Sequence, residues 1–283
     1  MGRDEGERSV TIEVIYRIIQ LMAVVLIGLI IVRVALSHRF KAAGYNQGVG
    51  KTCGTKEAQE DCFGISKNSR GTMVVLTDGM GKKQGGALSA SLVVETALDI
   101  FERDNAFYNP NYFFQKLLNQ ANRRILDRLD EGAYGASVAI ALIDKSTFYY
   151  AVVGNVQVAV YRDKELIPIT EGHTINVLAE KKYMQGNLTK QETIALLQEQ
   201  RLYNFVGRDE FSEVEVFDQP IKLKSGDIVI LMTDGVYETI GYSGIEDRLK
   251  TGGNCQMMAD AIVKEIDALQ EEKDNGSIVL LSV

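Results

Sequence analysis

Two stretches of the chain end in the same tripeptide, Thr-Asp-Gly. They read MVVLTDGMG at residues 73–81 and IVILMTDGVYE at residues 228–238, and each begins with a run of apolar residues that is typical of a strand. Further carboxylates, Asp274 and the pair Glu60 and Asp61, directly precede other apolar runs. Singly, an Asp-Gly pair is most often only a turn, because Asp hydrogen-bonds its own backbone and Gly accepts positive φ.

Together, these carboxylates predict a shared site. In an antiparallel sheet the end of one strand lies beside the start of its neighbour, so Asp78, Asp234 and Asp274 can converge on one edge. Such carboxylates would repel one another unless a cation lay among them. Oxygen ligands without His or Cys suit Mg²⁺ or Mn²⁺, and Gly79 lets its carbonyl approach an ion closely. The pattern alone supports a metal site and plain turns about equally.

The composition narrows the chemistry further. The chain has 283 residues, a net charge of −7, three cysteines and two histidines. The negative charge argues against a nucleic-acid partner, because binding to polyphosphate relies on Lys and Arg. An odd number of cysteines without a CxxC pair indicates reduced thiols, and two histidines give poor support for a zinc site or a Ser-His-Asp triad. Hydrolytic chemistry must therefore depend on carboxylates.

The most apolar stretch lies near the N-terminus. Residues 18–32 read IIQLMAVVLIGLIIV, and with their flanks they predict a membrane-spanning helix over 15–36, after a short tail at 1–14. The acidic segment before it and the lack of a small-residue cleavage site argue against a signal peptide, and a buried core helix would show a polar face. More Lys and Arg follow the stretch than precede it, so we expect a single-pass protein of the cell membrane with its large domain in the cytoplasm.

Hydrophobic periodicity predicts the elements that must position the carboxylates. Strands are expected at 73–77, 137–144, 148–153, 157–161, 213–217, 227–233 and 277–283. Helices are expected at 86–103, 112–129 and 256–269, and two shorter ones within 174–200, the second beginning after Thr189 as N-cap. Consecutive strands with short gaps favour hairpins, so the order predicts a layered α+β sandwich.

An ordered set of motifs between Gly54 and Val283 resembles the metal-dependent protein phosphatases of type 2C (PPM), bacterial branch. The motifs are Gly54-x-Lys56-x-x-Gln59-Glu60-Asp61 for the family's GxRxxNED, Asp78-Gly79-Met80-Gly81 for DGMGG, Gly135-Ala136-Ser137 for GST, Gly154-Asn155-Val156-Gln157 for GDSR, Gly172-His173 for Asp-His, Thr233-Asp234-Gly235 for SDG, and Asp274-Asn275 for DN. Seven motifs in order are far more specific than any one of them.

The resemblance implies a four-layer α-β-β-α sandwich of two antiparallel sheets flanked by helices. It also implies hydrolysis of phosphoserine and phosphothreonine in proteins, by hydroxide held between two Mg²⁺ or Mn²⁺ ions. Asp78 would bridge the ions, with Asp61, Gly79, Asp234 and Asp274 as further ligands, and Asp78 and Asp234 would be catalytic. Glu60 and Asn275 would lie around them. Partners would be phosphorylated proteins, the substrates of a Ser/Thr kinase.

Two departures from the family pattern bear on function. Lys56, expected to bind the substrate phosphate, stands where the family has Arg and lacks its planar fork. Asn155 replaces an Asp that helps hold a third ion, so a third ion is not expected.

Two other functions remain open from the sequence. One is a catalytically weak phosphatase-like module that senses or scaffolds at the membrane, and the other is a hydrolase of small phosphate esters. The expected domains are a linker at 37–53 and a phosphatase domain at 54–283, with a flap at 172–208.

Overall fold

The structure, a computed structural model, describes Gln20, Met22 and residues 46–81, 84–129, 134–199, 201–209, 211 and 213–283. The chain divides into two units, Met1–Tyr45 and Asn46–Val283. Apart from Gln20 and Met22, the predicted membrane segment lies outside the described residues. Among the residues that are described, no helix has both the length and the apolar character needed to cross a bilayer.

The second unit contains two antiparallel sheets. In one, the strand order is β1 (Asn46–Thr52), β11 (Gly276–Ser282), β10 (Ile228–Met232), β6 (Gln157–Arg162) and β7 (Glu165–Pro168). In the other, the order is β2 (Cys62–Asn68), β3 (Gly71–Gly81), β4 (Tyr134–Asp144), β5 (Thr147–Val153) and β8 (Glu215–Val216), and β9 (Ile221–Lys222) also pairs with β5. Three pairs of strands that are close in sequence form hairpins, namely β2 with β3, β4 with β5 and β6 with β7, whereas β3–β4 and β10–β11 pair across helical connections.

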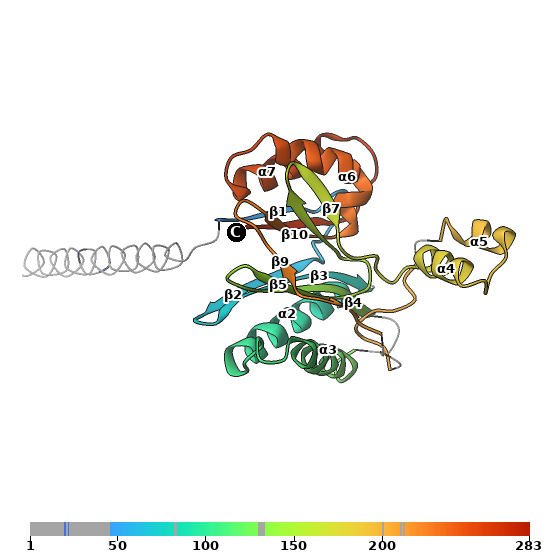
Figure 1. Ribbon diagram of the computed structural model, residues 1–283, viewed down its shortest axis with the longest axis horizontal. Helices are drawn as coiled ribbons and strands as arrows, with labels where there is room; N and C mark the ends of the chain where they lie inside the picture. The colour runs from blue at the N-terminus through green and yellow to red at the C-terminus, as the bar shows by residue number, and fades with distance from the viewer. Residues whose placement is uncertain are drawn as a thin grey trace, which may run out of the picture. The chain divides into compact units, whose positions relative to one another are not determined.

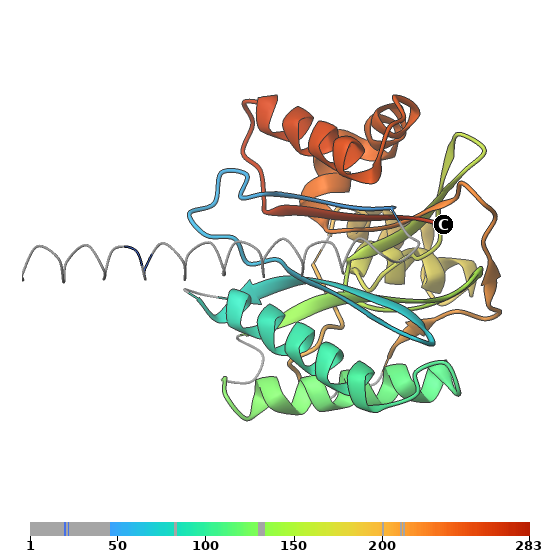
Figure 2. The same cartoon turned by 90° about the vertical axis from the view of Figure 1, so that its left-hand side faces the viewer.

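Helices cover the outer face of each sheet (Figures 1 and 2). α2 (Gly85–Arg103) packs on β2, β3 and β4, with α3 (Pro110–Leu126) against α2. α6 (Asp234–Lys250) and α7 (Cys255–Ala268) cover the β1–β11 sheet. Because both faces of the sheets are covered, the strands are buried on both sides, as nine consecutive residues of β4 are. The predicted α+β arrangement of two antiparallel sheets flanked by helices is confirmed.

The predicted flap contains α4 (Ile175–Met184) and α5 (Lys190–Leu196), which extend away from the sheets in Figure 1. Thr189 is the N-cap of α5, as expected. Its hydroxyl accepts from the backbone N–H of Glu192, whose carboxylate accepts from the Thr189 N–H, so both members of a capping box are present.

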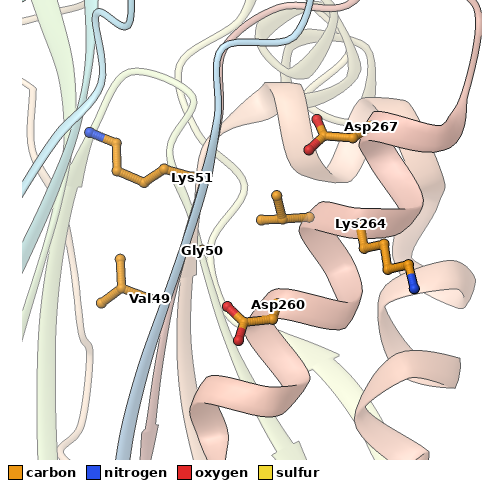
Figure 3. Close-up of a pocket in the computed structure, with 7 residues that line it drawn as sticks. Val49, Gly50, Lys51, Asp260, Lys264 and Asp267 are labelled. Atoms are coloured by element: carbon orange, nitrogen blue, oxygen red, sulfur yellow. The ribbon is translucent and has the colours of Figure 1, made fainter.

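The linker predicted at 37–53 is wrong for its last residues, because 46–52 form β1, an edge strand paired with β11 over its full length. The glycines that suggested a linker instead allow α7 to approach. A Cβ on Gly48 would lie 2.1 Å from the carbonyl oxygen of Cys255, and one on Gly50 would lie 2.6 Å from Val263. Figure 3 shows β1 passing α7 at Gly50. The folded domain therefore begins at Asn46 and not at Gly54.

Candidate active site

The predicted aspartates meet where strands of both sheets end or begin. β10 and β11 are antiparallel neighbours with Met232 opposite Ile278, so Asp234 and Asp274 lie just beyond the same edge. In the other sheet Asp78 lies near the end of β3, and Asp61 directly precedes β2, which pairs with β3. The strand-end geometry expected from the sequence is thus present, with each sheet contributing two carboxylates.

The carboxylates raise one another's pKa. Burial first, and then the charges of Asp234, Asp61 and Asp274, raise the pKa of Asp78 well above its usual range. Burial raises the pKa of Asp61 to about 6, with Asp234 adding to the effect. Burial and then Asp274 raise the pKa of Asp234. A cluster whose carboxylates resist ionisation together stores repulsion that a cation would relieve.

Asp61 is the most enclosed member, with 4% of the residue exposed. Its Oδ2 accepts a hydrogen bond of 3.1 Å from the hydroxyl of Thr233. Its Oδ1 is buried and, among the described residues, makes no hydrogen bond of regular geometry, although the Ser277 hydroxyl lies near enough to lower the pKa of Asp61. The Thr233 oxygen also accepts from the Ser277 N–H at 2.9 Å. The sequence did not lead us to predict a role for Thr233, although its position in the repeated Thr-Asp-Gly could have indicated one.

Lys56 and Asp274 form an ion pair at the outer side of the cluster. The Lys56 ammonium lies 3.1 Å from Asp274 Oδ1, and their side chains are 49% and 53% exposed. The hydrogen bond to Asp274, and then the charges of Asp274, Glu60 and Asp78, raise the pKa of Lys56. An exposed pair of this kind adds little stability, so both groups can exchange partners at small cost.

Close backbone approaches shape the floor of the cluster. A Cβ on Gly79 would lie 2.1 Å from the Gly86 carbonyl oxygen and 2.8 Å from that of Glu60, and a Cβ on Gly235 would lie 2.0 Å from that of Asn275. Glycine is therefore required at both Asp-Gly positions by contact, and not by a turn.

Asn275 is buried and organises the loop that carries Lys56. Its Oδ1 accepts from the Glu60 N–H at 2.8 Å, and its Nδ2 donates to the carbonyls of Cys53 and Ala58 at 3.0 Å each. It thus shapes the backbone around the aspartates. Asn155 lies on the opposite side, with its Nδ2 donating to Asp234 Oδ2 at 2.6 Å. All nine predicted site residues are thus gathered around one edge of the two sheets.

Within the described ranges, no three acidic, imidazole or thiol side chains are spaced so that they could hold an ion as they stand. Asp274 faces Lys56, and Asp234 faces the amide of Asn155. The donor set nevertheless fits a hard cation such as Mg²⁺ or Mn²⁺: it consists of carboxylate and carbonyl oxygens, and it includes the buried Oδ1 of Asp61.

Comparisons with known proteins show the family and the fold of the chain. The family model described as stage II sporulation protein E (SpoIIE) matches residues 68–283. A serine/threonine phosphatase, stp, of Listeria welshimeri is 22% identical over 230 residues, which cover 78% of this chain and 89% of that protein.

Two solved structures share the fold. The serine/threonine phosphatase of S. agalactiae superposes with a TM-score of 0.73 at 18% identity, over 85% of this chain and all of that one. The catalytic domain of the serine/threonine protein phosphatase PstP, solved with two manganese ions, superposes with a TM-score of 0.65 at 16% identity, over 84% of this chain and 97% of that one.

Proposed function

The chain belongs to the SpoIIE family, and on that premise we propose that it is a metal-dependent protein phosphatase that hydrolyses phosphoserine and phosphothreonine. The observation that carries the proposal is the cluster of Asp61, Asp78, Asp234 and Asp274, in which three carboxyl groups have a raised pKa and one buried oxygen makes no hydrogen bond of regular geometry among the described residues. The named phosphatase activity of the relatives supports the same reaction.

We propose that Asp61, Asp78, Asp234, Asp274 and the carbonyl of Gly79 hold two Mg²⁺ or Mn²⁺ ions. The two manganese ions of PstP support this number. When bound, such ions lower the pKa of water so that hydroxide exists near neutral pH, and they offset negative charge on the phosphoryl oxygens.

Lys56 is the proposed contact for the substrate phosphate. Its ammonium is half exposed and is held beside the cluster by Asp274 and by the charges of Glu60 and Asp78. A phosphate that approaches the aspartates would therefore meet a cation that can leave Asp274. Because Lys is a point charge without the bidentate fork of Arg, it should accept phosphate groups in more than one orientation.

The proposed setting is the membrane surface. The apolar stretch 18–32 supports a single-pass anchor, and the positive charges that follow it support a cytoplasmic domain. The expected partners are proteins that a Ser/Thr kinase has phosphorylated.

Phosphate release from a phosphoserine or phosphothreonine peptide tests the proposal. The full-length chain should release phosphate with Mn²⁺ and not with excess EDTA, and Asp234→Asn should abolish turnover. Asp260→Asn is a matched control, because Asp260 lies on α7 beside β1 (Figure 3) and, within the part of the chain that the structure describes, its carboxylate accepts a local hydrogen bond from Gln256. Absence of turnover under all conditions would favour the sensing or scaffolding module, and turnover of small phosphate esters alone would favour the metabolite hydrolase.

A further inference from the structure

Asn155 touches the cluster directly. It lies between β5 and β6, and only 8% of the residue is exposed. Its Nδ2 donates to Asp234 Oδ2 over 2.6 Å, which is short for a hydrogen bond between an amide and a carboxylate. One oxygen of Asp234 is therefore held by a neutral donor from another part of the chain.

Three further hydrogen bonds fix the orientation of Asn155. Its Oδ1 accepts from the Ser137 hydroxyl at 2.7 Å, and its backbone N–H donates to the same Ser137 oxygen at 3.3 Å. Its backbone carbonyl accepts from the Tyr237 hydroxyl at 2.9 Å. Because the Ser137 hydroxyl donates to Oδ1, the amide presents its N–H groups, and not its oxygen, to Asp234.

The same contacts connect the two sheets across the site. Ser137 belongs to β4 and is the register partner of Asp78 on β3. The path from Asp78 through Ser137 and Asn155 to Asp234 therefore consists of one backbone pairing and two side-chain hydrogen bonds. Together with the hydrogen bond from Thr233 to Asp61, these links set the spacing between Asp78, on β3 of one sheet, and Asp234, which follows β10 of the other.

The base of the flap holds the turn that contains Asn155. His173 Nδ1 accepts from the Gly154 N–H at 3.0 Å, and the His173 N–H donates to the Gly154 carbonyl at 2.8 Å. Gly154 has φ of 91°, and a Cβ there would lie 2.2 Å from the Ser137 oxygen. Two hydrogen bonds to His173 and the close approach of Ser137 thus hold the turn in place, and they restrict the position of the Asn155 side-chain amide.

We propose that Asn155 is a positioning residue for Asp234, whose carboxylate it holds in a fixed orientation relative to Asp78. The proposal rests on the proposed function. An acidic side chain in this place would set a like charge against Asp234, whereas the amide donates a hydrogen bond to it. Asn155 thus orients a catalytic carboxylate without taking part in the reaction itself.

The test compares full-length Asn155→Ala with Ser137→Ala and with Asn122→Ala as the matched control. Asn122, on α3, is also buried, at 7% exposed, and its side chain makes three hydrogen bonds, all of them to the backbone of Gly207 and Arg208. We expect Asn155→Ala to lower kcat at saturating Mn²⁺ by about tenfold or more and to change KM by less than about threefold, as loss of a charged hydrogen bond predicts. Ser137→Ala should shift kcat in the same direction by less, and Asn122→Ala should lower only thermal stability.

Calorimetric titration with Mn²⁺ provides a readout apart from turnover. Asn155→Ala should bind Mn²⁺ about tenfold more weakly than the unchanged chain, and Asn122→Ala should bind it equally well. If the unchanged chain binds Mn²⁺ but has no turnover, the proposed function fails while this comparison still decides the role of Asn155. Equal Mn²⁺ affinity and equal kcat in Asn155→Ala and the unchanged chain would overturn the positioning role.

Discussion

Replacing Asp61 by Asn should stabilise the protein when divalent cations are absent. The amide keeps an oxygen that can accept a hydrogen bond from Thr233. The substitution removes, however, a buried carboxyl group whose pKa is raised by folding from 3.8 to about 6. A shift of about two units, at 1.36 kcal/mol per unit, corresponds to about 3 kcal/mol at pH 7.5. For a domain of this size that raises Tm by roughly 6–12 °C.

Thermal melts followed by circular dichroism, in EDTA and in Mn²⁺, measure this effect. Bound Mn²⁺ should reverse the order, because at 1,000 times its Kd a ligand stabilises the unchanged chain by about 4.1 kcal/mol, which exceeds the advantage of the variant, and should stabilise Asp61→Asn much less. Asp227→Asn is the control. Asp227 is also buried, and that burial alone would raise its pKa. Hydrogen bonds from Arg162 and the Lys224 N–H, with the charges of both residues, together outweigh the burial and lower the pKa, so loss of the carboxylate should destabilise the chain equally in both buffers.

Two results would refute the reasoning. A lower Tm for Asp61→Asn in EDTA would mean that the buried charge of Asp61 does not destabilise the folded chain. An equal gain from Mn²⁺ in the variant and the unchanged chain would mean that Asp61 lies outside any cation site.

Three further predictions concern the same edge of the sheets. In EDTA, the Tm advantage of Asp61→Asn should shrink as the pH falls from 7.5 to 5. The raised pKa of folded Asp61 costs stability only above the unfolded value of 3.8, and the whole cost is present above about pH 6. A Tm advantage that stays constant with pH in parallel melts would contradict this prediction. Gly235→Ala should lower the free energy of unfolding in urea by about 1–3 kcal/mol, because the new Cβ would lie 2.0 Å from the Asn275 carbonyl oxygen; an unchanged midpoint would show that the loop yields freely. Lys56→Met should raise KM for a phosphopeptide by about tenfold, and Lys56→Arg should lower it, because the guanidinium binds phosphate bidentately; steady-state kinetics in which neither variant changes KM would remove Lys56 from the phosphate site.

Much of the architecture could be predicted from local patterns. Apolar periodicity predicted the helices that became α2, α3 and α7, because α2 and α7 each bury an apolar face against a sheet and α3 buries one chiefly against α2. The capping box at Thr189 was readable because its two members are three residues apart. The aspartates were found because each adjoins an apolar strand.

Other elements could not be predicted, because their signal depends on distant contacts. β1 was read as a linker, since its glycines are explained only by the approach of α7. α6 was missed because Gly241 breaks its backbone at φ of 65° and it buries few residues. The hydrogen bonds from Thr233 to Asp61 and from Asn155 to Asp234 join residues 172 and 79 positions apart, and no local pattern reports such a pairing.

Anomalous diffraction from crystals of the full-length chain grown with MnCl₂ tests the central claim most directly. We expect two manganese peaks, each within about 2.5 Å of a carboxylate oxygen of Asp78, with Asp234 and Asp274 on one of them. Manganese peaks found only elsewhere on the protein, in crystals of a preparation that hydrolyses phosphopeptides with Mn²⁺, would contradict the account.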